Sequence, residues 1–217
     1  MITSFDELIA FLRRYHRHRL ADPSLAPSRI PAELPPALAR FHRELGALGD
    51  DTSERNAFYA QDQIVPVDRL TFADGQVTFA WENQGNWSAR CAVGEGDPPV
   101  LSNAGGRSFR VVCPSLEHFL TTLGLQEAVF SSPHLFAINQ DVAIDKVLAE
   151  PVQPLWRKGT LVYGKSTHAF HVSADGNVIV MSGQIGLWVG SRERPVRELL
   201  AEGVTDVNDI GSSQGGR

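Results

Sequence analysis

Residues 159–166 read Gly-Thr-Leu-Val-Tyr-Gly-Lys-Ser and match the phosphate-binding pattern G-x-x-x-x-G-K-S in full. That chemistry needs a compact loop whose backbone N–H groups surround a phosphate, followed directly by a helix. Thr-Leu-Val-Tyr instead favours a strand, and residues 167–172 alternate as a strand does. We therefore interpret the match as false, with a hairpin turn at Gly164-Lys165. No nucleotide is expected to bind at Gly159, Gly164, Lys165 or Ser166.

Histidines and cysteines are the other residues whose types could bind a metal or act in catalysis. His168 and His171 are three apart on a predicted strand, where such positions face opposite sides, so one ion cannot easily contact both. Cys91 and Cys113 form no C-x-x-C pair, and the pattern around them predicts small buried side chains. We expect no catalytic residue, metal or cofactor, although carboxylates distant in the sequence could still assemble into a site.

Polar residues gather between two predicted strands that each carry a tryptophan, in residues 81–87, and Asp-Pro-Pro-Val follows at 97–100. These side chains could serve the fold by satisfying backbone groups where the sheet turns. They could instead form the rim of a protein-binding surface, with Trp87 as an anchor. The candidates for partner contact are Glu82, Asn83, Gln84, Trp87 and Asp97.

Helices are predicted at three places in the first two thirds of the chain. Ser4 and Glu7 form an S-x-x-E capping box that opens a helix over 4–20. The Arg-rich face of this helix is either solvated or a patch for an acidic partner or nucleic acid. Pro35-Pro36 opens a second helix that ends at Gly46, and Ser115 caps a third that ends at Gly124.

Strands are predicted by period-two alternation around turn residues. Asp74-Gly75 joins 70–72 to 77–82, with the side chains of Val77, Phe79 and Trp81 on one apolar face. Further strands are predicted over 87–93, 109–112, 160–163, 168–173, 178–182 and 187–189, with a turn at 175–177 and a last short helix over 194–201. The spacing predicts an α+β protein with a mostly antiparallel twisted sheet flanked by helices.

Composition limits the class of protein. The chain has 217 residues, of which 42% are hydrophobic and 21% charged, the ordinary balance of a folded domain. The net charge of -5 argues against nucleic acid as the main ligand, because phosphate binding needs clustered Lys and Arg. We see no signal peptide and no apolar run of membrane-spanning length, and we expect a reduced, cytoplasmic setting.

Several segments together resemble the SUKH superfamily, and most closely the bacterial relatives of the Smi/Knr cell-wall-assembly regulators. The segments are 34–46, Gln-Ile-Val-Pro at 63–66, Phe-Ala-Trp-Glu-Asn-Gln at 79–84, Asp-Pro-Pro-Val at 97–100 and Leu-Glu-His-Phe-Leu at 116–120. The resemblance covers about residues 30–130. We predict one SUKH-like domain over 1–210, with a strand-rich extension from 131 and a disordered tail over 211–217.

The resemblance implies a protein-binding module without enzymatic activity. Bacterial SUKH proteins are often immunity proteins, which block a toxin domain, frequently a nuclease, in the cytoplasm. A basic toxin would suit a negatively charged inhibitor. The alternatives are a housekeeping scaffold or regulator of the same fold, or an unrecognised enzyme or small-ligand receptor with a deep, polar pocket. We expect a monomer or weak dimer, with no nucleic-acid or membrane partner.

Overall fold

Three α-helices and two antiparallel sheets of six strands each form the part of the chain that the computed structural model describes. This part covers residues 1–17, 29–49, 57–58, 60–94, 96–104, 106, 108–138, 143–160, 167–183, 186–204 and 208–209. The α+β class predicted from the sequence is confirmed. The strands form two separate sheets, however, where the pattern predicts one.

The helices are α1 (Phe5–Tyr15), α2 (Pro36–Gly49) and α3 (Leu116–Phe130). Ser4 caps α1 as predicted, since its hydroxyl accepts a hydrogen bond from the Glu7 N–H. The reciprocal bond of the box is displaced by one residue, because the Glu7 carboxylate accepts from the backbone N–H and hydroxyl of Thr3. The helix ends at Tyr15, five residues before the predicted end, and 18–20 lie outside the described residues.

Both predicted glycine stops are wrong. Gly46 lies inside α2 and Gly124 lies inside α3, so each helix continues through a residue that costs about 1 kcal/mol relative to Ala. A Cβ on Gly124 would approach Leu12 Cδ1 to 3.1 Å and Phe41 Cε2 to 3.6 Å. Gly124 thus allows the side chains of α1 and α2 to reach the surface of α3, and tertiary packing overrides its local preference. The buried face of Leu38, Phe41 and Leu45 supports α2 in the same way.

The first sheet, sheet A, contains β1 (Asp62–Ile64), β2 (Thr71–Ala73), β3 (Gln76–Glu82), β4 (Ser88–Ala92), β5 (Val100–Ser102) and β6 (Arg110–Cys113). Its order is β1-β3-β4-β5-β6, and β2 pairs with β3. The predicted hairpin turn is confirmed, with Asp74 at φ 50° and Gly75 at φ 70°. A β-bulge between Thr78 and Ala80 shifts the alternation of buried and exposed side chains. Ala80 is therefore buried, whereas Trp81, which the sequence predicts on the apolar face, is only half-buried.

The second sheet, sheet B, contains β7 (His134–Ile138), β8 (Val152–Thr160), β9 (Thr167–Ser173), β10 (Val178–Gly183), β11 (Gly186–Ser191) and β12 (Asn208–Asp209). Its order is β12-β7-β11-β10-β9-β8. The predicted strands that become β9, β10 and β11 are confirmed. The strand predicted over 160–163 is part of β8 at Thr160 only, and 161–163, like the tail 211–217, lie outside the described residues. The predicted helix over 194–201 is only a 3₁₀ turn, η4 (Val196–Glu198).

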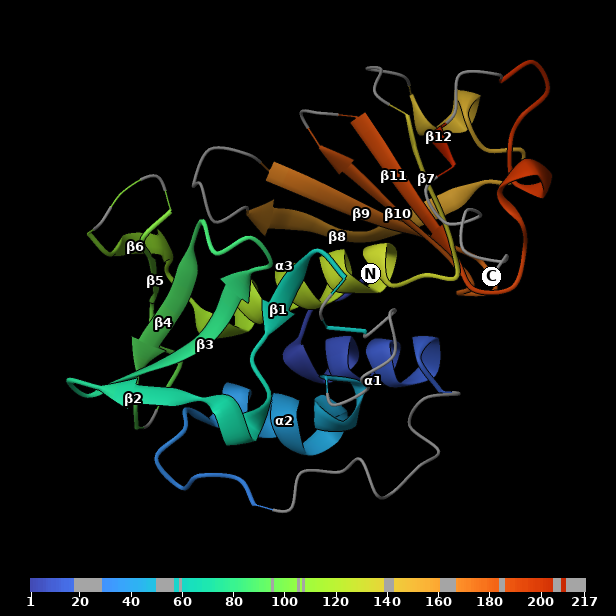
Figure 1. The fold of residues 1–217 in the computed structure, drawn as a ribbon. Helices are drawn as coiled ribbons and strands as arrows, with labels where there is room; N and C mark the ends of the chain where they lie inside the picture. The colour runs from blue at the N-terminus through green and yellow to red at the C-terminus, as the bar shows by residue number, and fades with distance from the viewer. Residues whose placement is uncertain are drawn as a thin grey trace, which may run out of the picture.

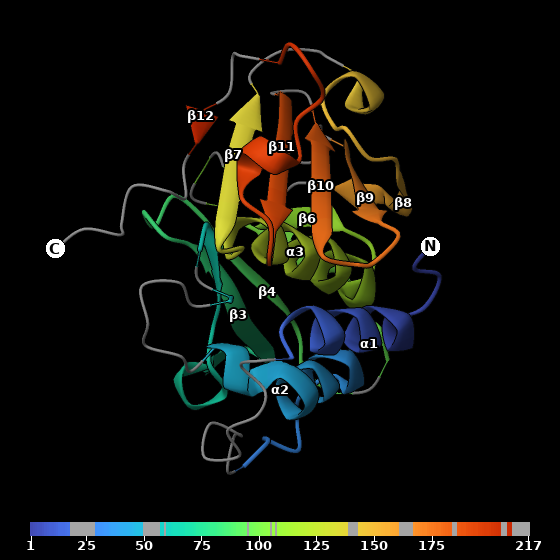
Figure 2. The same cartoon turned by 90° about the vertical axis from the view of Figure 1, so that its right-hand side faces the viewer.

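Helix α3 lies at the centre of the molecule, with sheet B on one side and α1 on the other, and all three helices lie on one side of sheet A (Figure 1 and Figure 2). The main core is formed by α3, the other helices and the inner faces of both sheets. The predicted burial of Cys91 and Cys113 as small side chains within this core is confirmed. A smaller core on the far face of sheet B joins Phe136, Val180 and Val189 to the segments at Leu148 and Leu199.

Two short 3₁₀ turns complete the description: η2 (Val67–Arg69) precedes β2, and η3 (Ile144–Lys146) precedes β8. None of the helices in the described ranges is long and apolar enough to cross a membrane.

Gly190 tests the close approach of β11 to α3. A Cβ at this position would lie 2.7 Å from the Val129 carbonyl oxygen and would also collide with the Ser132 hydroxyl. We expect Gly190→Ala to lower the free energy of unfolding by about 1–3 kcal/mol through overpacking, measured by urea denaturation. Gly106→Ala is the matched control, since no atom of the other described residues lies within 4 Å of its added Cβ. Equal stability of the two variants would contradict the packing described here.

Candidate functional site

The phosphate-loop pattern over 159–166 begins in strand β8, and its residues 161–166 lie outside the described residues. Gly159 lies in β8, and its added Cβ would stand 2.6 Å from the His168 carbonyl oxygen, so the position needs glycine for strand packing. Gly164, Lys165 and Ser166 are outside the described residues. The residues that follow form strand β9, where phosphate binding by this motif requires a helix.

The two histidines of β9 face opposite sides of sheet B, as the sequence predicts. His168 is 4% exposed and packs against Gly183 on the side of the main core. His171 lies on the other side, where it lines a surface groove. Burial lowers the pKa of both imidazoles, and nearby Arg157 lowers the pKa of His171 further. Because the two rings lie on opposite faces of the sheet, they cannot bind the same ion.

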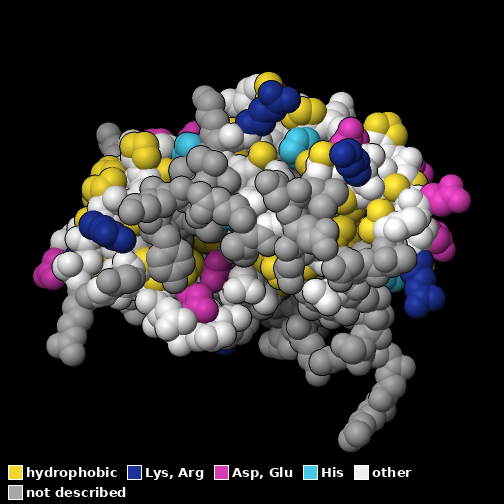
Figure 3. All heavy atoms as spheres, turned by 90° about the horizontal axis from the view of Figure 1, so that it is seen from above, with side chains coloured by type: hydrophobic (Ala, Val, Ile, Leu, Met, Phe, Trp, Pro, Cys, Tyr) yellow, Lys and Arg dark blue, Asp and Glu magenta, His cyan; other side chains and the backbone are white. Residues whose placement is uncertain are grey.

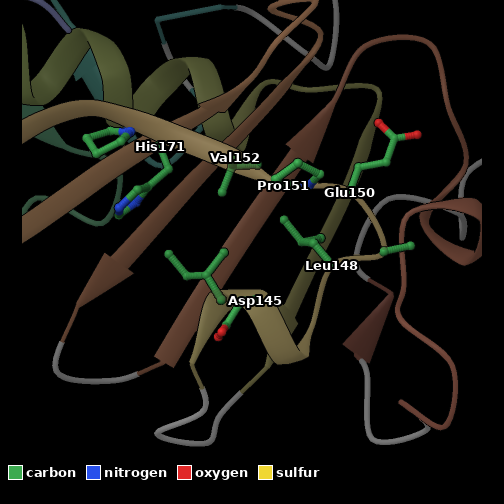
Figure 4. Close-up of a pocket in the computed structure, with 9 residues that line it drawn as sticks. Asp145, Leu148, Glu150, Pro151, Val152 and His171 are labelled. Atoms are coloured by element: carbon green, nitrogen blue, oxygen red, sulfur yellow. The ribbon is translucent and has the colours of Figure 1, made fainter.

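The groove beside His171 has a volume of about 490 Å³ and runs between η3 and the edge strand β8. Its middle is apolar, with Leu148 and Val152 between His171 at one end and Glu150 at the other (Figure 4). The Glu150 carboxylate accepts two hydrogen bonds from Arg194, at 2.6 and 2.9 Å. The polar groups of this groove are spread along it, whereas catalysis needs them to converge on one reacting atom.

The predicted partner-binding segment 82–87 is a turn built around the Glu82 carboxylate. Its Oε2 accepts hydrogen bonds from the backbone N–H groups of Gln84, at 3.1 Å, and Asn86, at 3.0 Å. The side chains of Asn83 and Gln84 are exposed and remain free to contact a partner. Trp87 is 4% exposed and belongs to the main core, so its indole is not presented to a partner.

Asp97 lies at the start of α3. Its Oδ1 accepts a hydrogen bond from the Glu117 N–H at 2.9 Å, while the Ser115 hydroxyl accepts from the His118 N–H at 3.0 Å. Two side chains thus satisfy the free donors of the first helical turn, where a negative charge is also favoured by the helix dipole. Asp97 therefore has a role in the fold, one of the two roles that the sequence allows for it.

A buried pair of carboxyl groups, Glu127 and Asp62, was not identified from the sequence. Glu127 is fully buried in α3 and accepts three backbone N–H bonds, from Ala60, Gln61 and Asp62, at 2.8–3.1 Å. The Asp62 carboxyl accepts a hydrogen bond from Gln126 Nε2 at 2.6 Å. An available signal was a charged residue in the otherwise apolar part of the helix, Leu-Gln-Glu-Ala-Val.

Burial is the main cause of the altered acidity of this pair. It raises the pKa of Glu127 to about 8, and the neighbouring Asp62 charge adds to the rise while the three N–H donors oppose it. Burial also raises the pKa of Asp62 to about 6, where the bond from Gln126 opposes the rise and the charge of Glu82 adds to it. Glu127 joins the start of β1 to α3, and both of its oxygens and Oδ2 of Asp62 accept hydrogen bonds from protein donors.

A different set of residues lies on the outer face of sheet A. Strand pairing places Thr71, Thr78, Arg90, Leu101 and Val111 side by side in one row across the sheet. The Arg90 guanidinium carbon stands 3.6 Å from the centre of the Phe109 ring. Val111 is 60% exposed, and Met1 and Phe72 are the other exposed large hydrophobic residues of the described ranges. We call Arg90, Leu101, Phe109 and Val111 the Arg90 surface.

Arg90 is a fixed but uncompensated cation. Among the described residues its Nε is buried without a hydrogen-bond partner, and no carboxylate forms an ion pair with it. Stacking on an aromatic ring holds the planar guanidinium in place, which reduces the entropy lost when it binds an anion. Seen from the sheet B end, the coloured charged side chains, both basic and acidic, stand apart from one another (Figure 3).

Comparisons of the chain with protein-family models, with curated proteins and with solved structures found no match in any of the three. Function therefore has to be inferred from the residues of this chain.

The role of Glu82 can be separated from that of its neighbours. Glu82→Ala removes the acceptor of two backbone N–H groups, and we expect it to lower the free energy of unfolding by about 0.5–1 kcal/mol. Asn83→Ala, whose side chain is exposed, serves as the control and should change stability less. Urea denaturation of the three proteins makes this test. A larger loss for the Asn83 variant would refute the structural role of Glu82.

The buried carboxyl pair predicts a defined pH dependence of stability. Both groups hold their protons more tightly in the folded than in the unfolded chain, so the free energy of unfolding falls as the pH rises from about 4 to about 8. Asp62→Asn removes one titrating group and the charge that raises the pKa of Glu127, and we expect a smaller fall. Denaturation at several pH values measures this slope.

The matched control for this slope is Asp68→Asn, a substitution at an exposed position of η2. It should leave the fall in stability unchanged. A slope in the Asp62 variant as steep as in the unsubstituted chain would contradict the coupling of the pair.

Proposed function

We propose that this chain is a non-enzymatic protein-binding module, and that it acts in the cytoplasm as an immunity protein against a bacterial toxin domain such as a nuclease. The SUKH-like motifs at 34–46, 79–84 and 97–100 motivate the immunity assignment. The α+β architecture with antiparallel sheets is compatible with that resemblance.

The Arg90 surface is the observation that carries the protein-binding part of the proposal. Arginine and aromatic residues dominate the energetic centres of protein interfaces, and the stacked Arg90–Phe109 pair supplies both. Leu101 and the exposed Val111 extend it with apolar area that would leave water on binding. The alternate positions Ala89, Cys91 and Val100 of the same strands are buried in the main core, so the row that contains Arg90 faces away from that core.

The use of the carboxylates supports a role without catalysis. Glu82, Asp97 and Glu127 each accept backbone N–H groups at a turn, a helix start or a strand entrance. A general base must instead reach the proton of a substrate, and a nucleophile must reach its reacting atom. These three side chains are committed to the fold.

A housekeeping scaffold of the same fold would use the same kind of surface and differ only in its partner. The exposed Asn83 and Gln84 remain additional candidates for contact in either case.

The immunity proposal predicts that a toxin domain is encoded beside this chain in its genome, and that domain is the partner to test. Co-expression in sensitive cells should restore growth, and the two purified proteins should form a complex with a dissociation constant of about 1 nM to 1 μM by calorimetry. The purified chain alone should not degrade nucleic acid. Neither rescue nor a complex would refute the immunity proposal, and capture of a resident cellular protein in its place would favour the scaffold.

A further inference from the structure

The Arg90 surface indicates the chemistry of the partner, an inference that rests on the proposed protein-binding function. We propose that this surface binds a patch of a partner protein in which an Asp or Glu carboxylate is flanked by apolar side chains. This differs from the simple expectation, from the net charge of -5, that the partner is basic at the contact.

The first argument is local charge. In the row Thr71, Thr78, Arg90, Leu101 and Val111, the guanidinium is the one ionised group. No carboxylate of the described residues forms an ion pair with it, so an incoming acceptor would replace no internal salt bridge. A guanidinium offers parallel N–H donors that match the two oxygens of a carboxylate. The complementary charge on the partner is therefore negative.

The second argument is the apolar frame around that charge. Leu101 lies directly beside Arg90 on β5, and Val111 lies beside Leu101 on β6. The Phe109 ring covers the guanidinium plane at 3.6 Å. Apolar side chains of a partner that pack here would exclude water and strengthen the ion pair at the centre.

A nucleic-acid phosphate could also neutralise Arg90, but the surroundings favour a protein. Phosphate backbones are bound by several clustered cations, whereas the other members of this row are neutral. Two apolar neighbours, one of them 60% exposed, match side chains better than a charged sugar–phosphate chain.

The test is selection of peptides from a random displayed library against the full chain, followed by affinity measurement of the enriched peptides. We expect the enriched peptides to share an Asp or Glu next to apolar residues. Arg90→Gln should weaken their binding about tenfold or more, because it removes a charge-assisted hydrogen bond. Enriched peptides without an acidic residue, or acidic peptides that bind the Arg90→Gln variant equally well, would overturn the inference.

Two further variants keep the test independent of folding. Val111→Asp adds a negative charge at an exposed position and should also weaken acidic peptides, with an unchanged thermal midpoint. Arg157→Gln, at an exposed position of β8 in the other sheet, is the matched control and should bind as the unsubstituted chain does. Equal weakening by the Arg157 variant would also overturn the inference, as would binding of an RNA duplex that depends on Arg90.

The same variants separate this inference from the immunity proposal. If the unsubstituted chain binds the toxin domain and Arg90→Gln binds it equally well, the immunity proposal stands and the chemistry inferred here is wrong. If the unsubstituted chain does not bind the toxin domain, the immunity proposal is wrong, and the peptide selection still decides the chemistry of the Arg90 surface.

Discussion

The burial of helix α3 is the constraint on which the rest of the structure depends. Sheet B packs on one side of this helix, α1 packs on the other, and its residues belong to the same core as the inner face of sheet A. A helix enclosed in this way has few positions that can tolerate a large or charged side chain. Gly124 leaves room on the helix for side chains of α1 and α2, and Gly190 leaves room on β11 for the backbone of the helix. Ser115 and Asp97 satisfy its first N–H groups. Glu127 is a carboxyl residue that is fully buried in the helix, and it is tolerated because three backbone N–H groups donate hydrogen bonds to its oxygens.

This arrangement divides the polar residues into two kinds. Carboxylates such as Glu82, Asp97 and Glu127 accept hydrogen bonds from backbone N–H groups, and their removal should lower the free energy of unfolding. Arg90 compensates nothing among the described residues, yet the Phe109 ring holds it in place. A charged side chain that the fold positions but does not use is the kind of group that a binding partner can pair with. The protein-binding proposal follows from this contrast.

Local patterns in the sequence predicted those elements whose structure is set by neighbouring residues. The hairpin at Asp74-Gly75 follows from two positions that need positive φ, and the caps at Ser4 and Ser115 follow from short-range hydrogen bonding. Features set by distant residues were missed. Gly124 looks like a helix end, because the sequence does not show that Leu12 and Phe41 of two other helices will pack against it. The Arg90 surface was missed as well, since its members come from three segments that only strand pairing brings together.

Hydrogen–deuterium exchange of the chain, alone and in complex with a protein partner that it binds, locates the binding surface. We expect slowed exchange on binding to be concentrated in β4, β5 and β6 around Arg90, Leu101 and Val111. Slowed exchange centred on η3, β8 and His171, with β4 to β6 unchanged, would place binding at the groove on the other sheet and would refute the role of the Arg90 surface.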